Sequence, residues 1–270
     1  FIVWIIYTFS LPLLIVSLLR NPLPELSPAL WKTIAIMMPL EIGALLLYLR
    51  ALKISPLSLA FPFLGLTPVF TILTSFILLE ERLSAWGIIG VAIVSLGAYL
   101  LNARSAREGV FGPVRNIYRE KGAILMIIVA FIYSLTSVLG KKAILASSAE
   151  SFPAIYYTIF FVIITPVVCV KICLDYRHTG RKKPFLLLGA EQRKKIMLFI
   201  ALGLSFAVSI LFHYKALSLT RVSYMISVKR LSLVISVIYG ALIFKEDAIG
   251  YRLLGALVML GGVLILSFMQ

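Results

Sequence analysis

Two adjacent cations inside an apolar stretch are the residues of this chain best suited to chemistry. Lys229 and Arg230 lie about eight residues into an apolar run over 221–244, roughly 12 Å along a helix. A cation at the bilayer centre costs at least about 2.5–3.5 kcal/mol, so the pair needs a compensating environment. Arginine offers a planar fork and lysine a mobile point charge, which together suit an anion. The alternative is a structural pair that snorkels to a headgroup or bridges to an acid.

Three further residues are candidates, each with a structural alternative. Glu41 is the only acid deep within an apolar run. Two roles are open for a carboxylate inside a membrane: a proton relay, or a counter-ion for an intramembrane Lys or Arg. Tyr133 and Tyr224 are candidates to line a cavity, and buried packing with a satisfied hydroxyl explains them equally well.

The elements that must hold these residues are membrane helices. The chain has 61% hydrophobic and 14% charged residues, with a mean hydropathy of +1.04, whereas soluble domains carry about 25% charged residues. Apolar runs of about 18–24 residues can cross a hydrocarbon core of about 30 Å as helices, and they predict an all-helical bundle. We expect nine visible helices, over about 1–19, 31–49, 56–79, 86–102, 122–144, 152–174, 196–215, 221–244 and 251–268.

The net charge of +15 does not indicate nucleic acid, because most basic residues lie between the apolar runs. We expect two basic clusters to face anionic lipid headgroups of the bilayer and to set the orientation. The clusters are Arg104, Arg107, Arg115, Arg119 and Lys121, and then Arg177, Arg181, Lys182, Lys183, Arg193, Lys194 and Lys195.

The chain also repeats itself. The segment 51–101 aligns without a gap on 216–266, at a constant offset of 165 (216 − 51). An internal repeat in a membrane protein is typical of transporters, whose two halves can rock around a site between them. Matching positions include Ser58 and Ser223, Leu66 and Leu231, Glu81 and Glu246, Gly90 and Gly255, and Gly97 and Gly262.

The repeat predicts a first repeat over 1–103, a basic linker over 104–121 and a second repeat over 122–270. The second repeat has five predicted helices and the first has four. We therefore expect a further helix upstream of residue 1, which would give ten helices in two inverted five-helix repeats. A natural nine-helix protein is the alternative.

Small and acidic residues at matching positions predict structural roles. Glu81 and Glu246 precede the next helix in each repeat, where an acid favours the helix N-terminus. Glycines let helices approach closely in membranes. We expect this of the glycines at 87, 90, 97, 255, 261 and 262.

Several segments together resemble the EamA type of the drug/metabolite transporter superfamily. They are Ala51-Leu52-Lys53-Ile54-Ser55-Pro56, Thr67-Pro68-Val69-Phe70 and Leu79-Glu80-Glu81-Arg82-Leu83-Ser84, with Ala216-Leu217 and Phe244-Lys245-Glu246-Asp247 in the second copy. The resemblance implies ten helices, a central cavity between the repeats and transport of small metabolites by alternating access. It also implies that both termini lie in the cytoplasm, whereas the loop charges favour the opposite orientation, so orientation stays open.

A second resemblance concerns basic residues. Lys141 and Lys142 follow an apolar run over 122–140, and from that run alone they are equally well interfacial anchors. Together with the pair Lys229-Arg230, they look similar to the plastid sugar-phosphate translocators of the same superfamily. Basic residues at the end of the sixth helix and a Lys-Arg pair on the ninth bind phosphate there. The resemblance therefore implies Lys142 or Lys141, Lys229 and Arg230 as substrate ligands.

These observations predict a secondary-active transporter of a small anionic or zwitterionic metabolite, coupled to protons or a counter-substrate, in the cytoplasmic (inner) membrane of a prokaryote. An exporter of neutral or cationic amino acids or drugs is the alternative. An integral membrane enzyme is disfavoured, because the sequence has no Ser/His/Asp set, no metal-ligand spacing and no phosphate-cradling glycine loop. We therefore expect no catalytic residue and no cofactor.

Overall fold

The computed structural model describes residues 2–21, 26–55, 61–102, 121–179, 190–235 and 249–268, and every regular element in these ranges is helical. The all-helical prediction is thereby confirmed. The linker residues 104–120, the residues 180–189 and Glu246 lie outside the described residues. The helices are α1 (Ile2–Arg20), α2 (Pro28–Ile54), the 3₁₀ helix η1 (Phe61–Leu66), α4 (Thr67–Leu79), α5 (Ala85–Asn102), α7 (Lys121–Leu145), α8 (Phe152–Thr179), α9 (Ala190–Leu219), α10 (Val222–Lys229) and α12 (Ile249–Phe268).

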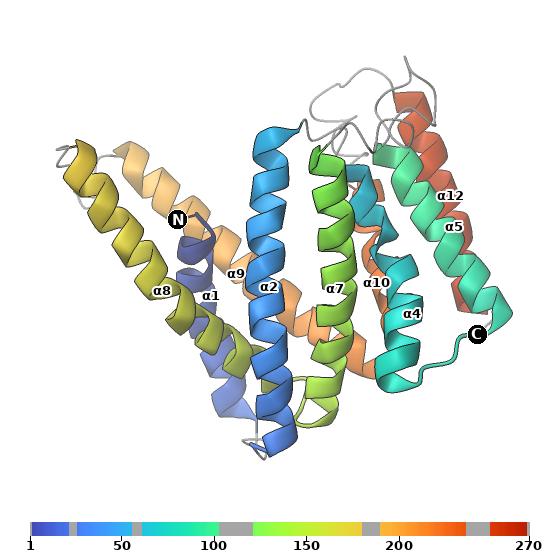
Figure 1. The fold of residues 1–270 in the computed structure, drawn as a ribbon, viewed down its shortest axis with the longest axis horizontal. Helices are drawn as coiled ribbons and strands as arrows, with labels where there is room; N and C mark the ends of the chain where they lie inside the picture. The colour runs from blue at the N-terminus through green and yellow to red at the C-terminus, as the bar shows by residue number, and fades with distance from the viewer. Residues whose placement is uncertain are drawn as a thin grey trace. The chain divides into compact units, whose positions relative to one another are not determined.

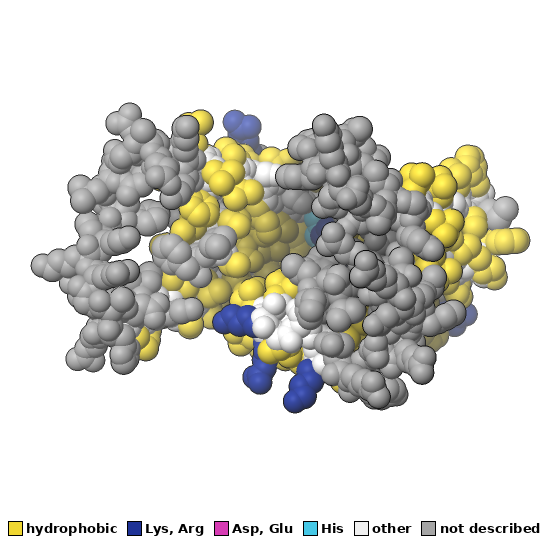
Figure 2. Space-filling view, turned by 90° about the horizontal axis from the view of Figure 1, so that it is seen from above, with side chains coloured by type: hydrophobic (Ala, Val, Ile, Leu, Met, Phe, Trp, Pro, Cys, Tyr) yellow, Lys and Arg dark blue, Asp and Glu magenta, His cyan; other side chains and the backbone are white. Residues whose placement is uncertain are grey.

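Five of the described helices are long and apolar enough to cross a membrane, judged by length and composition: α1, α2, α7, α8 and α9. The segment of η1 and α4, and the helices α5 and α12, are apolar but shorter. Large apolar side chains stand exposed on these helices, among them Leu19, Phe212 and Phe268, and apolar side chains cover much of the coloured surface in Figure 2. Such a surface is unfavourable in water and is expected where helices face lipid.

The helices form two compact units, and each unit combines segments of both sequence repeats. Unit 1 comprises Phe1–Ile34 and Ala143–Leu219, and unit 2 comprises Ala35–Lys142 and Thr220–Gln270. Accordingly α1, α8 and α9 belong to unit 1, whereas α4, α5, α10 and α12 belong to unit 2. All seven candidate residues lie in unit 2.

Within unit 1, α1 contacts both α8 and α9. The ring of Tyr7 on α1 packs edge-on against Phe160 of α8 and Phe206 of α9, with ring centroids 5.2 and 5.3 Å apart. At the end of α9, Lys215 forms an ion pair with Glu150. The hydrogen bond from this lysine holds the pKa of the Glu150 carboxyl below its usual range.

Within unit 2, α5 and α12 lie side by side (Figure 1) and pack through glycines at matching repeat positions. A Cβ added to Gly97 would lie 2.8 Å from the Gly255 carbonyl oxygen, and one added to Gly262 would lie 2.9 Å from that of Gly90. The offset of 165 relates these two contacts, because it pairs 97 with 262 and 90 with 255. The expectation of close approach is confirmed at these positions, whereas a Cβ on Gly261 would have nothing within 4 Å.

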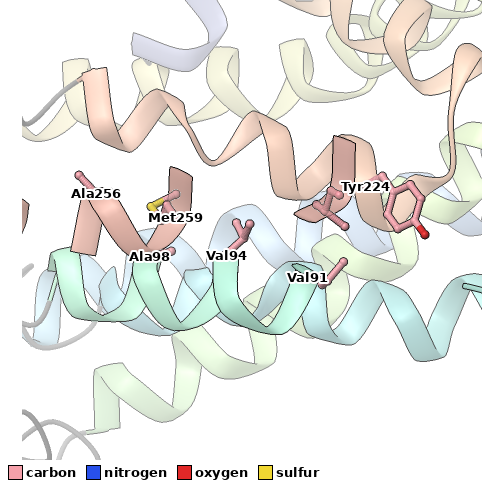
Figure 3. Close-up of a cluster of buried hydrophobic side chains, with 7 residues drawn as sticks. Val91, Val94, Ala98, Tyr224, Ala256 and Met259 are labelled. Atoms are coloured by element: carbon pink, nitrogen blue, oxygen red, sulfur yellow. The ribbon is translucent and has the colours of Figure 1, made fainter. Parts of the chain in front are cut away.

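Buried apolar side chains complete the contact between α5 and α12. Figure 3 shows side chains in a row along α5, side chains of α12 beside them, and Tyr224 of α10 toward one end of the row. The α5 residues are Val91, Val94 and Ala98, and the α12 residues are Ala256, Met259 and Leu266. Because α5 and α12 are closely packed against each other, they form a rigid part of unit 2. The segments that precede them in each repeat are attached to this rigid part.

The 3₁₀ helix η1 lies against α5 and shares a buried side-chain cluster with α2 and α7. Phe63 and Leu64 of η1 form a buried cluster with Ala51 of α2 and with Met126 and Ala130 of α7. Since α2 and α7 also carry candidate residues, this contact brings the irregular segment of the first repeat to the helices that hold them.

Candidate functional site

The helix that carries the cation pair is discontinuous. α10 ends at Lys229, residues 230–231 form a turn, and helix resumes over 232–235. The backbone N–H groups of residues 230 and 231 donate to the carbonyls three residues earlier, at 3.0 and 2.9 Å, which is the tighter spacing of a 3₁₀ turn. The prediction of one continuous helix over 221–244 is therefore wrong here, and its last residues lie outside the described part of the chain.

The first repeat is interrupted at the same register. A continuous helix over 56–79 was predicted, but the α-helix begins only at Thr67, after η1. The offset of 165 places η1 opposite 226–231, which ends on the turn that interrupts the second copy. Pro62 and Pro68 supply a reason in the first copy, because proline removes backbone N–H donors. Irregular backbone at membrane depth is tolerated where it lies within protein or lines a cavity, and broken helices form binding sites in transporters.

Arg230 lies at the second interruption and reaches the first. Its Nη2 donates a hydrogen bond to Thr67 Oγ1 at 2.8 Å, and Thr67 in turn donates to the Leu64 carbonyl at 2.8 Å. The Nε of Arg230 is buried and has no hydrogen-bond partner among the residues that the structure describes. An unpaired buried donor costs about 1–3 kcal/mol, so an acceptor brought by a ligand would be stabilised there.

Polar residues of α2 and α7 lie beside the cation pair. Glu41 of α2 interacts with the side chain of Thr136 on α7 and, electrostatically, with Lys229. Tyr133, almost one turn before Thr136 on α7, interacts electrostatically with Glu41 and with Arg230. The structure therefore brings four of the seven candidates together, and we call them, with Thr67 and Thr136, the Arg230 cluster.

The Arg230 cluster has an unbalanced charge. Lys229 and Arg230 contribute two positive charges and Glu41 one negative charge, a formal net of +1 (2 − 1). The side chain of Lys229 is exposed and that of Arg230 is intermediate in exposure. Because charges attract more strongly at atoms shielded from water, such as the buried Arg230 Nε, a cluster with one excess cation suits a group that carries one negative charge.

Lys141 has protein partners of its own. Its Nζ forms an ion pair with Glu81 Oε1 at 2.8 Å and donates to the Thr220 carbonyl at 2.6 Å. Lys142, the next residue, is exposed near the end of α7. The structure does not bring either lysine into the Arg230 cluster as we have defined it, and their role as substrate ligands stays a prediction.

Glu81 acts on α10 and not on the helix that follows it in sequence. Its Oε2 accepts a hydrogen bond from the Val222 N–H at 3.0 Å, at the first residue of α10. The start of α5 is capped by Ser84, whose Oγ accepts from the Gly87 N–H at 3.0 Å. Because Ser84 caps the N-terminus of α5, the Glu81 carboxylate is available to link the first N–H of α10 to the Lys141 ammonium group.

We expect Glu81→Gln to destabilise the protein by about 2 kcal/mol, because it weakens two hydrogen bonds that involve charged groups. Both partners of the ion pair are largely shielded, with side-chain exposures of 13% and 12%. The neighbouring exposed residue supplies a matched control, Glu80→Gln. Unfolding in detergent micelles would measure both variants, and equal stabilities would contradict a structural role for the pair.

Tyr224 lies in the apolar packing of unit 2. Its side chain is 4% exposed and belongs to the buried cluster between α5 and α12. The hydroxyl accepts a hydrogen bond from Arg221 Nη1 at 3.3 Å, and the ring fills the space above Gly87, where a Cβ would collide with it. These contacts agree with the second interpretation of Tyr224, a packed side chain with a hydrogen-bonded hydroxyl, and not with a residue that lines a cavity.

Two residues of the Arg230 cluster, Thr67 and Thr136, are missing from the sequence-based set. A signal for Thr67 exists in the repeat, because it is the first residue after the interruption and its partner Ser232 also has a hydroxyl. Thr136 lies among the hydroxyl residues of the segment 134–137 on α7, which is otherwise apolar. No single-residue pattern distinguishes it from its neighbours.

The fold and the cluster define a multi-pass helical membrane protein with charged residues at interrupted helices, as in membrane transporters. The model of the EamA-like transporter family matches residues 1–103 and 120–268, and the chain belongs to that family. The resemblance to the EamA type of the drug/metabolite transporter superfamily is confirmed, and the protein is a membrane transporter of that type.

Other comparisons add the fold alone. No curated protein matches the chain. A solved structure described only as "Crystal structure of protein" is similar to it with a TM-score of 0.69 and 18% sequence identity, over 98% of this chain and 86% of that chain.

Proposed function

We propose that this transporter carries a small anionic or zwitterionic metabolite, and that the Arg230 cluster binds its negative group. The observation that carries the proposal is the buried Nε of Arg230, which lacks a hydrogen-bond partner among the described residues. A carboxylate or phosphate oxygen would supply the missing acceptor in a charge-assisted hydrogen bond. Transport would be secondary-active and would proceed by alternating access around this site.

The other residues of the cluster have complementary roles in this proposal. The exposed Lys229 supplies a second, mobile cation for the negative group. Glu41 balances the charge of Lys229 and would take the ammonium group of a zwitterion. A carboxylate inside the membrane also suits coupling of transport to protons. Tyr133 supplies a hydroxyl next to both charges.

Thermal stability of the purified protein in detergent tests the proposal. A panel of single compounds would include phosphate and lactate as anions, glycine as a zwitterion, putrescine as a cation and glucose as a neutral solute. A ligand at one hundred times its Kd stabilises by about 2.7 kcal/mol. We expect stabilisation by anions or zwitterions only, lost in Arg230→Gln. Stabilisation by the cation or the neutral solute alone, kept in Arg230→Gln, would contradict the proposal and favour an exporter of such compounds.

A further inference from the structure

The two helix interruptions meet in one hydrogen bond, between Arg230 of the second repeat and Thr67 of the first. We infer that Thr67 is the positioning residue of the anion site: its hydroxyl fixes the Arg230 guanidinium so that the remaining donors, Nε included, face the bound anion. This inference rests on the proposed function of the Arg230 cluster and adds a residue that determines how tightly that site binds.

The direction of each hydrogen bond supports the assignment. A hydroxyl has one proton to donate and lone pairs to accept with. Thr67 gives its proton to the Leu64 carbonyl at 2.8 Å, so its oxygen is left as an acceptor for Arg230 Nη2 at 2.8 Å. The side chain is buried, at 2% exposure. A buried hydroxyl whose proton is already committed is therefore a fixed acceptor for the guanidinium.

The local backbone explains why the acceptor is rigid. Thr67 is the first residue of α4, and Leu64 belongs to η1, so the bond between them spans the junction of the two helices. Leu64 itself is buried with residues of α2 and α7. The position of the Thr67 oxygen is thus set by packed elements on both sides, and it restrains a long arginine side chain that otherwise has many rotamers.

One of the five guanidinium N–H donors is used by Thr67. The Nε donor is buried and unpaired among the described residues. Holding the guanidinium in place before an anion arrives lowers the ordering cost of binding, because fewer side-chain rotamers must be fixed at that moment. Removal of the Thr67 hydroxyl should therefore weaken anion binding, although this hydroxyl does not itself contact the anion.

The same helix offers a matched control. Thr71, one turn later on α4, is fully buried and donates to the Pro68 carbonyl at 2.6 Å. It makes the same kind of bond to a carbonyl three residues earlier as Thr67 does. Thr67→Val and Thr71→Val therefore make the same chemical change in similar surroundings, and they differ in the contact with Arg230.

The test measures the Kd of inorganic phosphate and of glycine by thermal shift, using the purified full chain. We expect Thr67→Val to raise the Kd of whichever probe binds the wild type by about tenfold or more. Thr67→Ser, which keeps the hydroxyl, should stay within about twofold, and Thr71→Val should not change the Kd. Thr67→Ala carries the same expectation as Thr67→Val if valine prevents folding.

The outcomes separate this inference from the proposed function. Normal binding by Thr67→Val alongside lost binding by Arg230→Gln overturns the positioning role and leaves the anion site standing. Equal weakening by Thr71→Val, or no rescue by Thr67→Ser, also overturns it, because the effect would then be structural. Wild-type affinity in Arg230→Gln, or no binding of either probe by the wild type, overturns the anion site and the inference together.

Discussion

Proteoliposomes that contain Arg230→Gln are expected to take up the substrate with a kcat/KM at least about 30-fold below that of the wild type. The substitution removes one positive charge, so the Arg230 cluster loses its net charge of +1. It also removes the unpaired Nε donor that we propose binds the substrate. Truncation of one partner of a buried, hydrogen-bonded charge pair costs about 2–5 kcal/mol, which corresponds to a factor of roughly 30 or more. Initial rates of uptake for the compound identified by thermal shift would give this ratio.

The control for this experiment lies at the opposite end of α10. Arg221 stands at the start of α10, where its side chain is exposed and contacts the Tyr224 ring and hydroxyl. Arg221→Gln makes the same substitution outside the Arg230 cluster, so uptake should remain within about twofold of the wild type. If Arg230→Gln takes up the substrate as fast as Arg221→Gln does, Arg230 does not bind the negative group of the substrate.

The second large effect is expected from Gly262→Ala, which should lower the free energy of unfolding by about 1–2 kcal/mol. Its Cβ would lie 2.8 Å from the Val94 backbone nitrogen and 2.9 Å from the Gly90 carbonyl oxygen. Backbone atoms cannot move aside alone, so α5 and α12 would have to separate. Overpacking of this kind costs about 1–3 kcal/mol, against a gain in helix propensity of up to about 1 kcal/mol for alanine over glycine.

The adjacent residue is the matched control for the glycine prediction. Gly261→Ala makes the same change on the same helix, and its Cβ would have nothing within 4 Å. That variant should be as stable as the wild type or slightly more stable, because only the propensity gain remains. Unfolding of both variants in detergent micelles would measure the difference, and equal stabilities would show that the close contact between α5 and α12 contributes little.

The helical class and most helix positions could be predicted from the sequence, because long apolar runs have few alternatives to helices in lipid. The runs at 31–49 and 122–144 correspond to α2 and α7, which extend further at both ends. Helix ends are less predictable, since polar residues that flank an apolar run can continue the helix beyond it. The packing of glycines was also predictable, because the repeat places them at equivalent positions.

The interruptions of the helices were harder to predict. In the first copy Pro62, Gly65 and Pro68 lie at the interruption, and all three are of residue types that disfavour a regular helix. In the second copy the equivalent residues are Ser227, Arg230 and Leu233, and none of them breaks a helix by itself. Carrying Pro62 and Pro68 across the offset of 165 would have placed the second interruption between Ser227 and Leu233, the segment that contains Arg230.

The candidate site was predicted in part because charge is costly inside a membrane. Lys229, Arg230 and Glu41 stood out by their apolar surroundings, and the structure brings them together. Lys141 was a candidate only through the resemblance to sugar-phosphate translocators, and its partner Glu81 lies 60 residues away (141 − 81) in the sequence. Which acid neutralises which base is decided by the packing of helices, and no local pattern contains that information.

The central claim is that Arg230 holds the negative group of the substrate. A structure of the full chain with the compound selected by thermal shift would test it most directly. We predict the carboxylate or phosphate oxygen of that compound about 2.7–3.2 Å from Arg230 Nε, with the Thr67 bond to Nη2 kept. A bound compound whose negative group lies away from Arg230, with Nε still unpaired, would contradict the account.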